Sequence, residues 1–168
     1  YEGGKRSRAV HTEEAQDAAA ARARYLEWVD SGKAEGMIVR TSDGRTSKVK
    51  PLIDLDAVAI GYTRRGEDPS QVRSVLLALR RSDDQFQVLG SVGNFGDDSV
   101  RREILSRLAP LDCPSGFRNA SSNGAMYRFV KPEVVMQIRV NDLQTEGVDG
   151  DPYRRMVLTL AGDEGWKP

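Results

Sequence analysis

The sequence predicts a mainly β protein with two helices, of the α+β class, and three observations lead to this prediction. Its 168 residues are 39% hydrophobic and 30% charged, as expected for one packed domain or two small ones. Short β-branched and apolar segments separated by polar turns recur along most of the chain. Only two stretches have the spacing of apolar residues that is typical of an amphipathic helix.

The first helix is predicted to follow a loop over residues 1–10 and to begin at Thr12. Thr12 can cap the helix, and the two glutamates after it suit the positive end of the helix dipole. Gly32 is placed to end the helix. The apolar stripe of this helix is expected at Ala15, Ala18, Tyr25, Leu26 and Val29.

A β-hairpin is predicted directly after this helix. Met37–Arg40 and Thr46–Lys50 are strand-like, Asp43-Gly44 is a turn signal between them, and Pro51 ends the second strand. A helix and a hairpin of about 40 residues are too small to hold a core alone. We therefore expect residues 1–53 to be part of one domain and residues 54–168 to form another.

Residues 54–168 show a different pattern, in which three strands, a helix and further strands follow one another. The strands are expected at Ala57–Tyr62, Val72–Arg80, Phe86–Val92, Ala125–Val130, Val134–Val140 and Arg154–Leu160. An amphipathic helix with Asp97 and Asp98 at its start and Pro110 at its end lies between the third and fourth strands. This order predicts a five-stranded Greek-key barrel of the OB type, with one additional short strand. A β-sandwich also has many short strands, but it rarely places a helix there.

The composition excludes several classes of chemistry. With one cysteine and one histidine, the chain can form neither a disulfide framework nor a Cys/His zinc site, and a Ser-His-Asp triad would need His11. Cys113 is interpreted as an incidental thiol, which favours a reducing, cytoplasmic location. No apolar run approaches the ~18 residues of a membrane span, so no membrane partner is expected. Because the 25 basic and 25 acidic side chains cancel, a nucleic acid would have to bind a local patch.

The hairpin carries the most informative group of residues. Glu35 lies where the helix gives way to the first strand, and Lys48 and Lys50 alternate on the second strand, so both lysines point to one face. A carboxylate that holds Mg²⁺ and two ammoniums that neutralise phosphate oxygens would suit a metal–phosphate group. An ordinary salt bridge on a solvated hairpin is the alternative.

These residues carry a resemblance to a known superfamily. Glu35–Arg40 followed by Ser47–Pro51 resembles the fourth and fifth signature motifs of the covalent nucleotidyltransferases, which comprise ATP-dependent DNA ligases, RNA ligases and capping enzymes. Asp56–Tyr62 resembles the segment that leads into the OB domain of ATP-dependent DNA ligases, and Phe86–Phe95 resembles the third strand of that domain. The resemblance spans about Thr12 to Leu108 and extends more weakly to the end.

The resemblance implies an assignment for each unit. Residues 1–53 would be the C-terminal end of an adenylation domain and contribute a partial nucleotidyltransferase hairpin, and residues 54–168 would be an OB domain, truncated at its C-terminus. Glu35 would hold Mg²⁺ at the nucleotide, while Lys48, Lys50 and Arg40 would bind ATP, Lys50 at the α-phosphate. The implied enzyme is a monomer that seals nicked duplex DNA in repair, replication or recombination through lysyl-adenylate and DNA-adenylate intermediates.

The sequence also departs from the family pattern. The nucleophilic lysine belongs to a K-x-D-G motif, which this chain lacks, so we expect that lysine upstream and no catalytic residue within the chain. Lys33 in Lys33–Gly36 lies only fifteen positions before Lys48, too close for that role, and is interpreted as a solvated lysine. The closing Arg-x-Asp-Lys motif is missing as well. The chain alone is therefore predicted to be inactive.

Arginine pairs are the candidates for contacts with DNA. Arg64 and Arg65 follow the first strand of the predicted barrel, where they can track a DNA backbone or balance neighbouring acidic residues. Arg101 and Arg102 are expected to face water on the second helix.

Aromatic residues and alternative functions complete the expectations. Phe86, Phe95, Tyr127 and Phe129 are expected in the core rather than stacked on bases. The alternatives are a fragment of an RNA ligase or capping guanylyltransferase, or a non-catalytic OB module that binds nucleic acid and prefers single strands.

Overall fold

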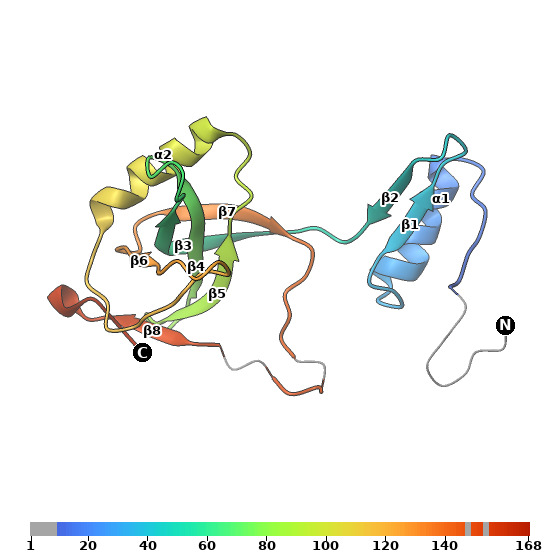
Figure 1. Cartoon of the computed structure of the whole chain (residues 1–168). Coiled ribbons are helices and arrows are strands. Elements are labelled where there is room, and N and C mark those ends of the chain that lie inside the picture. Colours follow the sequence, from blue (N-terminus) through green and yellow to red (C-terminus); the bar gives the residue numbers. More distant parts are fainter. Residues whose placement is uncertain (1–9, 147–148, 153–154) are drawn as a thin grey trace. The chain divides into compact units, whose positions relative to one another are not determined.

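A computed structural model describes residues 10–146, 149–152 and 155–168, and the chain divides into two compact units, Tyr1–Ile53 and Asp54–Pro168. Within the described part, strands predominate and there are two α-helices (Figure 1), which confirms the predicted fold class. The loop predicted for residues 1–10 falls almost entirely outside the described residues.

The first unit holds one helix and one hairpin. Helix α1 (Ala18–Tyr25) continues into a π-helical turn (Leu26–Asp30), and strands β1 (Met37–Arg40) and β2 (Thr46–Val49) pair antiparallel. The hairpin prediction is confirmed, although the second strand ends at Val49, one residue before Lys50.

The predicted start of the first helix is wrong. The N-cap is Asp17, whose carboxylate accepts a hydrogen bond from the Ala20 N–H at 2.7 Å, and four alanines follow it. Aspartate is a strong N-cap and alanine the best helix former, so the helix begins there and not at Thr12. The Thr12 hydroxyl instead donates to the Val10 carbonyl at 3.2 Å.

The residues before α1 run back along the helix. Glu13 forms a 2.6 Å ion pair with Arg24, and the rings of His11 and Trp28 meet edge to face at 4.7 Å. The predicted apolar stripe is correspondingly weak, because within this unit's described residues only Val29 is buried and Leu26 is 49% exposed. The helical stretch does end before Gly32, as predicted, where φ is +77°.

The second unit is the predicted barrel. Its elements are β3 (Ile53–Arg64), β4 (Val72–Arg80), β5 (Phe86–Val92), α2 (Asp98–Leu108), a 3₁₀ turn (Ala109–Leu111), β6 (Arg128–Phe129), β7 (Val135–Val140), β8 (Val157–Leu160), a second 3₁₀ turn (Gly162–Glu164) and β9 (Trp166–Lys167). The strands pair in the order β6-β3-β4-β5-β8-β9, and β7 also pairs with β3. After α2 the chain thus returns to β3, with which β6 and β7 pair, and β8 then pairs with β5. This is the Greek-key connection of an OB barrel.

In the second unit, one strand is longer than predicted and three are shorter: the strand predicted at Ala125–Val130 is reduced to Arg128–Phe129, and those predicted from Val134 and Arg154 begin at Val135 and Val157. β3 runs six residues beyond the predicted Ala57–Tyr62 because one edge pairs with β4 and the other with β6 and β7. β4 and β5 have the predicted bounds. The last predicted strand begins at Val157; Arg154, where it was expected to begin, lies outside the described residues.

Two buried clusters fill the barrel. One cluster packs under α2 and includes Tyr62, Val75 and Leu108, while the other includes Ile60, Phe86 and Trp166. Phe86, Tyr127 and Phe129 are buried and Phe95 is half-buried, which confirms the prediction that the aromatic residues belong to the core.

Trp166 belongs to the second buried cluster, and no pattern in the sequence predicted that this residue would be buried. Its ring is fully buried, contacts Phe86 edge to face at 5.1 Å, and its Nε1 donates to the Val130 carbonyl at 2.9 Å. Gly165 has φ +75°, and a Cβ there would lie 1.8 Å from the Pro114 carbonyl oxygen. Only glycine therefore lets the chain end approach the loop after α2 this closely.

Helix α2 begins as predicted, with Asp97 accepting hydrogen bonds from the Ser99 and Val100 N–H groups. The expectation that Arg101 faces water is wrong, because Arg101 is only 8% exposed. Its guanidinium donates to main-chain carbonyls at the start of β4 and after β5, and it lies 5.4 Å from the centre of the Phe95 ring. These carbonyls belong to Val72 (3.2 Å), Arg73 (3.4 Å) and Gly93 (2.8 Å).

Candidate nucleotide-binding site and nucleic-acid interface

The hairpin presents its predicted cations on its exposed face. Lys48 lies opposite Ile38 and Arg40 opposite Thr46 in the antiparallel register, so Arg40 and Lys48 share one face. This face is open to solvent, since both cations are exposed and Ile38 is 60% exposed. The opposite face carries Met37, which is half-buried.

Gly36 allows Lys50 to lie across the start of β1. A Cβ at position 36 would be 2.8 Å from the Val49 carbonyl oxygen and 2.9 Å from Lys50 Cγ, closer than real contacts permit. The Lys50 stem therefore packs against bare main chain next to Glu35. Its side chain is 22% exposed, whereas that of Glu35 is 79% exposed.

Glu35, Lys48 and Lys50 form one electrostatic group. The Lys50 Nζ donates a hydrogen bond to Glu35 Oε1. This hydrogen bond, then the charge of Lys50 and the charge of Lys48, hold the pKa of the Glu35 carboxyl below its usual value. The carboxylate is therefore ionised at neutral pH, beside two ammonium groups.

This group can bind a phosphate that carries a divalent cation. Mg²⁺ bound to a nucleotide usually takes one or two protein carboxylates and fills its other positions with phosphate oxygens and water. The hairpin supplies one such carboxylate in Glu35, and no cluster of three or more His, Cys, Asp or Glu side chains occurs among the described residues. The donor set fits a metal held jointly with phosphate.

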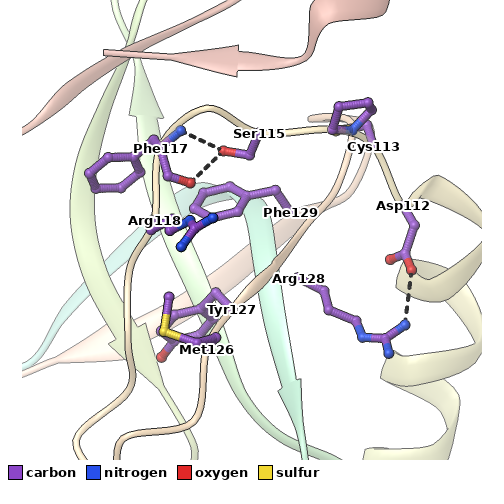
Figure 2. A pocket seen from close by; sticks show the side chains of 10 residues that line it. Asp112, Cys113, Ser115, Phe117, Arg118, Met126, Tyr127, Arg128 and Phe129 are labelled. Carbon is purple, nitrogen blue, oxygen red and sulfur yellow. Dashed lines mark hydrogen bonds and ion pairs between the residues drawn. The ribbon is translucent and has the colours of Figure 1, made fainter.

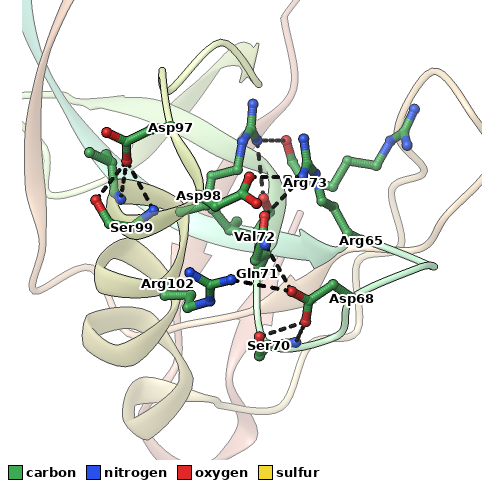
Figure 3. A network of polar contacts seen from close by, with 12 residues as sticks. Arg65, Asp68, Ser70, Gln71, Val72, Arg73, Asp97, Asp98, Ser99 and Arg102 are labelled. Atoms are coloured by element: carbon green, nitrogen blue, oxygen red, sulfur yellow. Dashed lines mark hydrogen bonds and ion pairs between the residues drawn. The ribbon is translucent and has the colours of Figure 1, made fainter.

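Arg64 and Arg65 stand in different environments at the end of β3, and Figure 3 shows the contacts of Arg65. Arg65 Nη1 donates to Gln71 Oε1 at 2.9 Å and to Asp98 Oδ1 at 3.1 Å, and its side chain is 29% exposed. Arg64 is exposed, and its Nη1 donates to the neutral Pro69 carbonyl at 3.2 Å. Arg64 therefore keeps its charge for an anion, while Asp98 partly neutralises Arg65.

The turn after β3 is held by its own polar contacts. Asp68 accepts hydrogen bonds from Ser70 and Gln71 and lies 3.7 Å from Arg102. Arg73, which belongs to no arginine pair in the sequence, is exposed on β4 beside this turn (Figure 3). A single arginine in an apolar strand carries no pattern; the ladder that pairs β3 with β4 is what brings it near Arg64.

Cys113 in the second unit and His11 in the first have different environments. Burial raises the pKa of the Cys113 thiol, which keeps it protonated and weakly nucleophilic. His11 hydrogen-bonds Glu13 at 3.0 Å in the first unit. No helix in the described part of the chain is long and apolar enough to cross a membrane.

Comparison with known proteins identifies relatives of this chain. Residues 68–160 match the family model described as the ATP dependent DNA ligase C terminal region. DNA ligase C1 of Mycolicibacterium smegmatis is 27% identical over 157 residues, which cover 86% of this chain and 43% of that protein. The chain thus spans less than half the length of this relative.

Two solved structures are also similar to this chain. The ligase domain of LigD from M. tuberculosis is 22% identical with a TM-score of 0.47, covering 90% of this chain and 49% of its own. A mycobacterial DNA ligase D complexed with ATP and MES is 20% identical with a TM-score of 0.44, and the match covers 73% of this chain and 37% of that chain.

Proposed function

Because this chain belongs to the family of ATP-dependent DNA ligase C-terminal regions, we propose that it is part of an enzyme that seals nicks in duplex DNA. In this proposal residues 1–53 are the C-terminal end of the adenylation domain, and residues 54–168 are the OB domain that binds DNA. The observation that carries the proposal is the gathering of Glu35, Lys48 and Lys50 at one edge of the hairpin that precedes the family-matched region.

In this proposal the two lysines bind the phosphates of ATP. Lys50 meets the α-phosphate, where negative charge develops during adenylyl transfer, and Lys48 and Arg40 lie on the same face of the hairpin. When ATP binds, the Lys50 ammonium exchanges the Glu35 carboxylate for a phosphate oxygen, which frees Glu35 for Mg²⁺. The metal ion, when bound, neutralises phosphate charge.

The nucleophile must come from outside this chain. The sequence contains no K-x-D-G motif, so the lysine that forms the lysyl-adenylate lies elsewhere in the parent protein. The same holds for the DNA-adenylate step, which consumes that intermediate. The chain by itself is expected to bind but not to catalyse, and the parent enzyme is expected to act as a cytoplasmic monomer in repair, replication or recombination.

The barrel suits the backbone of a duplex better than stacked single-stranded bases. Phe86, Tyr127 and Phe129 are buried, so they offer no open ring face to a base. Arg64 at the end of β3 and Arg73 on the paired strand β4 are exposed cations. Their charges can neutralise phosphates without reading sequence.

The test of this proposal is the intact mass of the parent polypeptide after incubation with Mg²⁺ and ATP or GTP. We expect a single AMP adduct, its loss in Lys50→Ala, and its retention in Lys33→Ala, the matched control on the same unit. A GMP adduct would reassign the protein to the capping enzymes, and no adduct would contradict nucleotidyl transfer. Sealing of a nicked DNA duplex rather than nicked RNA would distinguish DNA ligase from RNA ligase.

A further inference from the structure

A groove of about 590 Å³ lies beside the second buried cluster of the barrel, between the loop after α2 and the segment that leads into β6 (Figure 2). Neither the proposed nucleotide site nor the candidate DNA contacts involve it. The lining residues used below are Phe117, Arg118, Met126, Tyr127, Arg128 and Phe129.

The floor of the groove is preformed. Tyr127 and Phe129 are 7% and 5% exposed, and Phe117 packs edge to face on Phe129 at 5.8 Å. The Tyr127 hydroxyl is hydrogen-bonded to the Ser74 hydroxyl at 3.1 Å. A ligand that enters would therefore find the floor already ordered, which lowers the entropic cost of binding.

The wall opposite is fixed in the same way. The Ser115 hydroxyl accepts from the Phe117 N–H at 3.1 Å and donates to the Phe117 carbonyl at 2.7 Å (Figure 2). The Gly116 N–H donates to the Trp166 carbonyl at 2.8 Å, which ties this loop to the end of the chain. These contacts keep the groove open instead of letting the loop collapse into it.

The groove combines exposed apolar surface with cations. Met126 is 52% exposed, and Phe117 is half-buried above the floor. Arg118 is exposed and forms no ion pair with any described residue. Arg128 has only a 3.7 Å contact with Asp112, and its side chain is 64% exposed.

We propose that this groove docks a short segment of a partner protein in which an apolar side chain lies next to a carboxylate. The apolar side chain packs beside Met126 and Phe117, and the carboxylate pairs with Arg118. Methionine, aromatic residues and arginine are the residue types enriched at protein interfaces. An arginine that has no ion-pair partner among the described residues, beside an apolar pocket, gives such a segment its charge complementarity.

The same observations disfavour a nucleobase as the occupant. Stacking needs an open aromatic face, whereas Tyr127 and Phe129 are buried and Phe117 already contacts Phe129. Asp112 lies 3.7 Å from Arg128 and offsets part of its charge, which leaves Arg118 as the lining cation without a carboxylate partner among the described residues.

The probe that tests the proposal is a short fluorescein-labelled peptide in which a Leu-Phe pair is flanked by aspartates. Its control carries lysines in place of the aspartates. With the full chain we expect a Kd of about 10–100 μM for the acidic peptide, as is usual for small docking contacts. Arg118→Glu should weaken binding at least about tenfold, while Arg107→Glu, an equal charge change at an exposed position of α2, should not.

The site of binding can be read from methionine methyl groups. The chain has four methionines, and labelled peptide should shift the methyl signal of Met126 but not that of Met37 on the hairpin. Unsaturable binding, equal binding by Arg118→Glu, or an unmoved Met126 signal would overturn the proposal. So would a single-stranded oligonucleotide that binds with the same Arg118 dependence when the peptide does not.

Discussion

At the scale of single residues, the Lys50 ammonium donates a hydrogen bond to Glu35 Oε1. The depressed pKa of Glu35 means that this contact contributes stability above the carboxyl's usual value of 4.5. That contribution is lost as the pH falls through the lowered pKa and the carboxylate takes up a proton.

Lys50 lowers the pKa of Glu35 more than Lys48 does, and this difference can be tested. Lys50→Met removes both the hydrogen bond and the larger charge effect, so the pKa of Glu35 should rise toward its usual value. Lys48→Met removes only a smaller charge effect and should raise it less. A carboxyl NMR titration of the two variants measures both shifts, and equal shifts would contradict the geometry.

Gly36 leads to a second prediction at this scale. Gly36→Ala places a methyl group against the Val49 carbonyl and the Lys50 stem, which should displace the Lys50 ammonium from Glu35. We expect adenylyl transfer by the parent enzyme to fall at least about tenfold, in line with about 1–3 kcal/mol for an overpacked contact. Gly66→Ala, with no atoms near its Cβ, is the matched control and should leave the rate unchanged.

At the scale of elements, Arg101 determines how α2 sits on the barrel. Helix, strand and loop meet at its guanidinium, which donates to carbonyls of β4 and of the segment after β5. A buried cation is costly to bring out of water, and here carbonyl oxygens and the Phe95 ring replace part of the hydration, while the buried Nε has no hydrogen-bond partner among the described residues. The helix is thereby tied to two strands by one side chain.

Removing this guanidinium should destabilise the barrel. Arg101→Met leaves three main-chain carbonyls without their donor, and we expect a loss of about 2–4 kcal/mol in the free energy of unfolding. Arg102→Met, at a 53% exposed neighbour with a 3.7 Å ion pair, should change it by less than about 1 kcal/mol. Urea unfolding followed by tryptophan fluorescence compares the two, and similar losses would contradict the role of Arg101.

At the scale of the whole molecule, the two units divide the proposed work. The hairpin unit carries the group proposed to bind phosphate, and the barrel carries the exposed arginines proposed to contact DNA. The chain as a whole should therefore bind nicked duplex more tightly than a single strand of equal length, because its aromatic residues are buried.

Arg64 is the position where this can be tested. Arg64→Ala should weaken binding of nicked duplex about three- to tenfold and lower the slope of log affinity against log salt by about one. Arg80→Ala, an exposed arginine already paired with Asp84, should have a smaller effect. Fluorescence anisotropy over a salt series measures both, and an unchanged slope for Arg64→Ala would exclude it as a phosphate contact.

The sequence alone determined the elements whose signals are local. The bounds of β4 and β5, the Asp97 cap of α2 and the hairpin turn all depend on side-chain periodicity and on residues within a few positions of one another. The sequence also placed Glu35 and the two lysines on one hairpin, but Lys50 follows the end of β2 and meets Glu35 across Gly36, a contact that alternation along the strand does not give.

Only the tertiary structure decided the features that join distant parts of the chain. Arg65 is partly neutralised by Asp98, thirty-three residues away, and Arg101 is buried by carbonyls of other elements. Trp166 fills the core only because Gly165 lets the chain end approach Pro114. Each depends on which surfaces meet once the sheet has curled into a barrel, and no window of neighbouring residues contains that information.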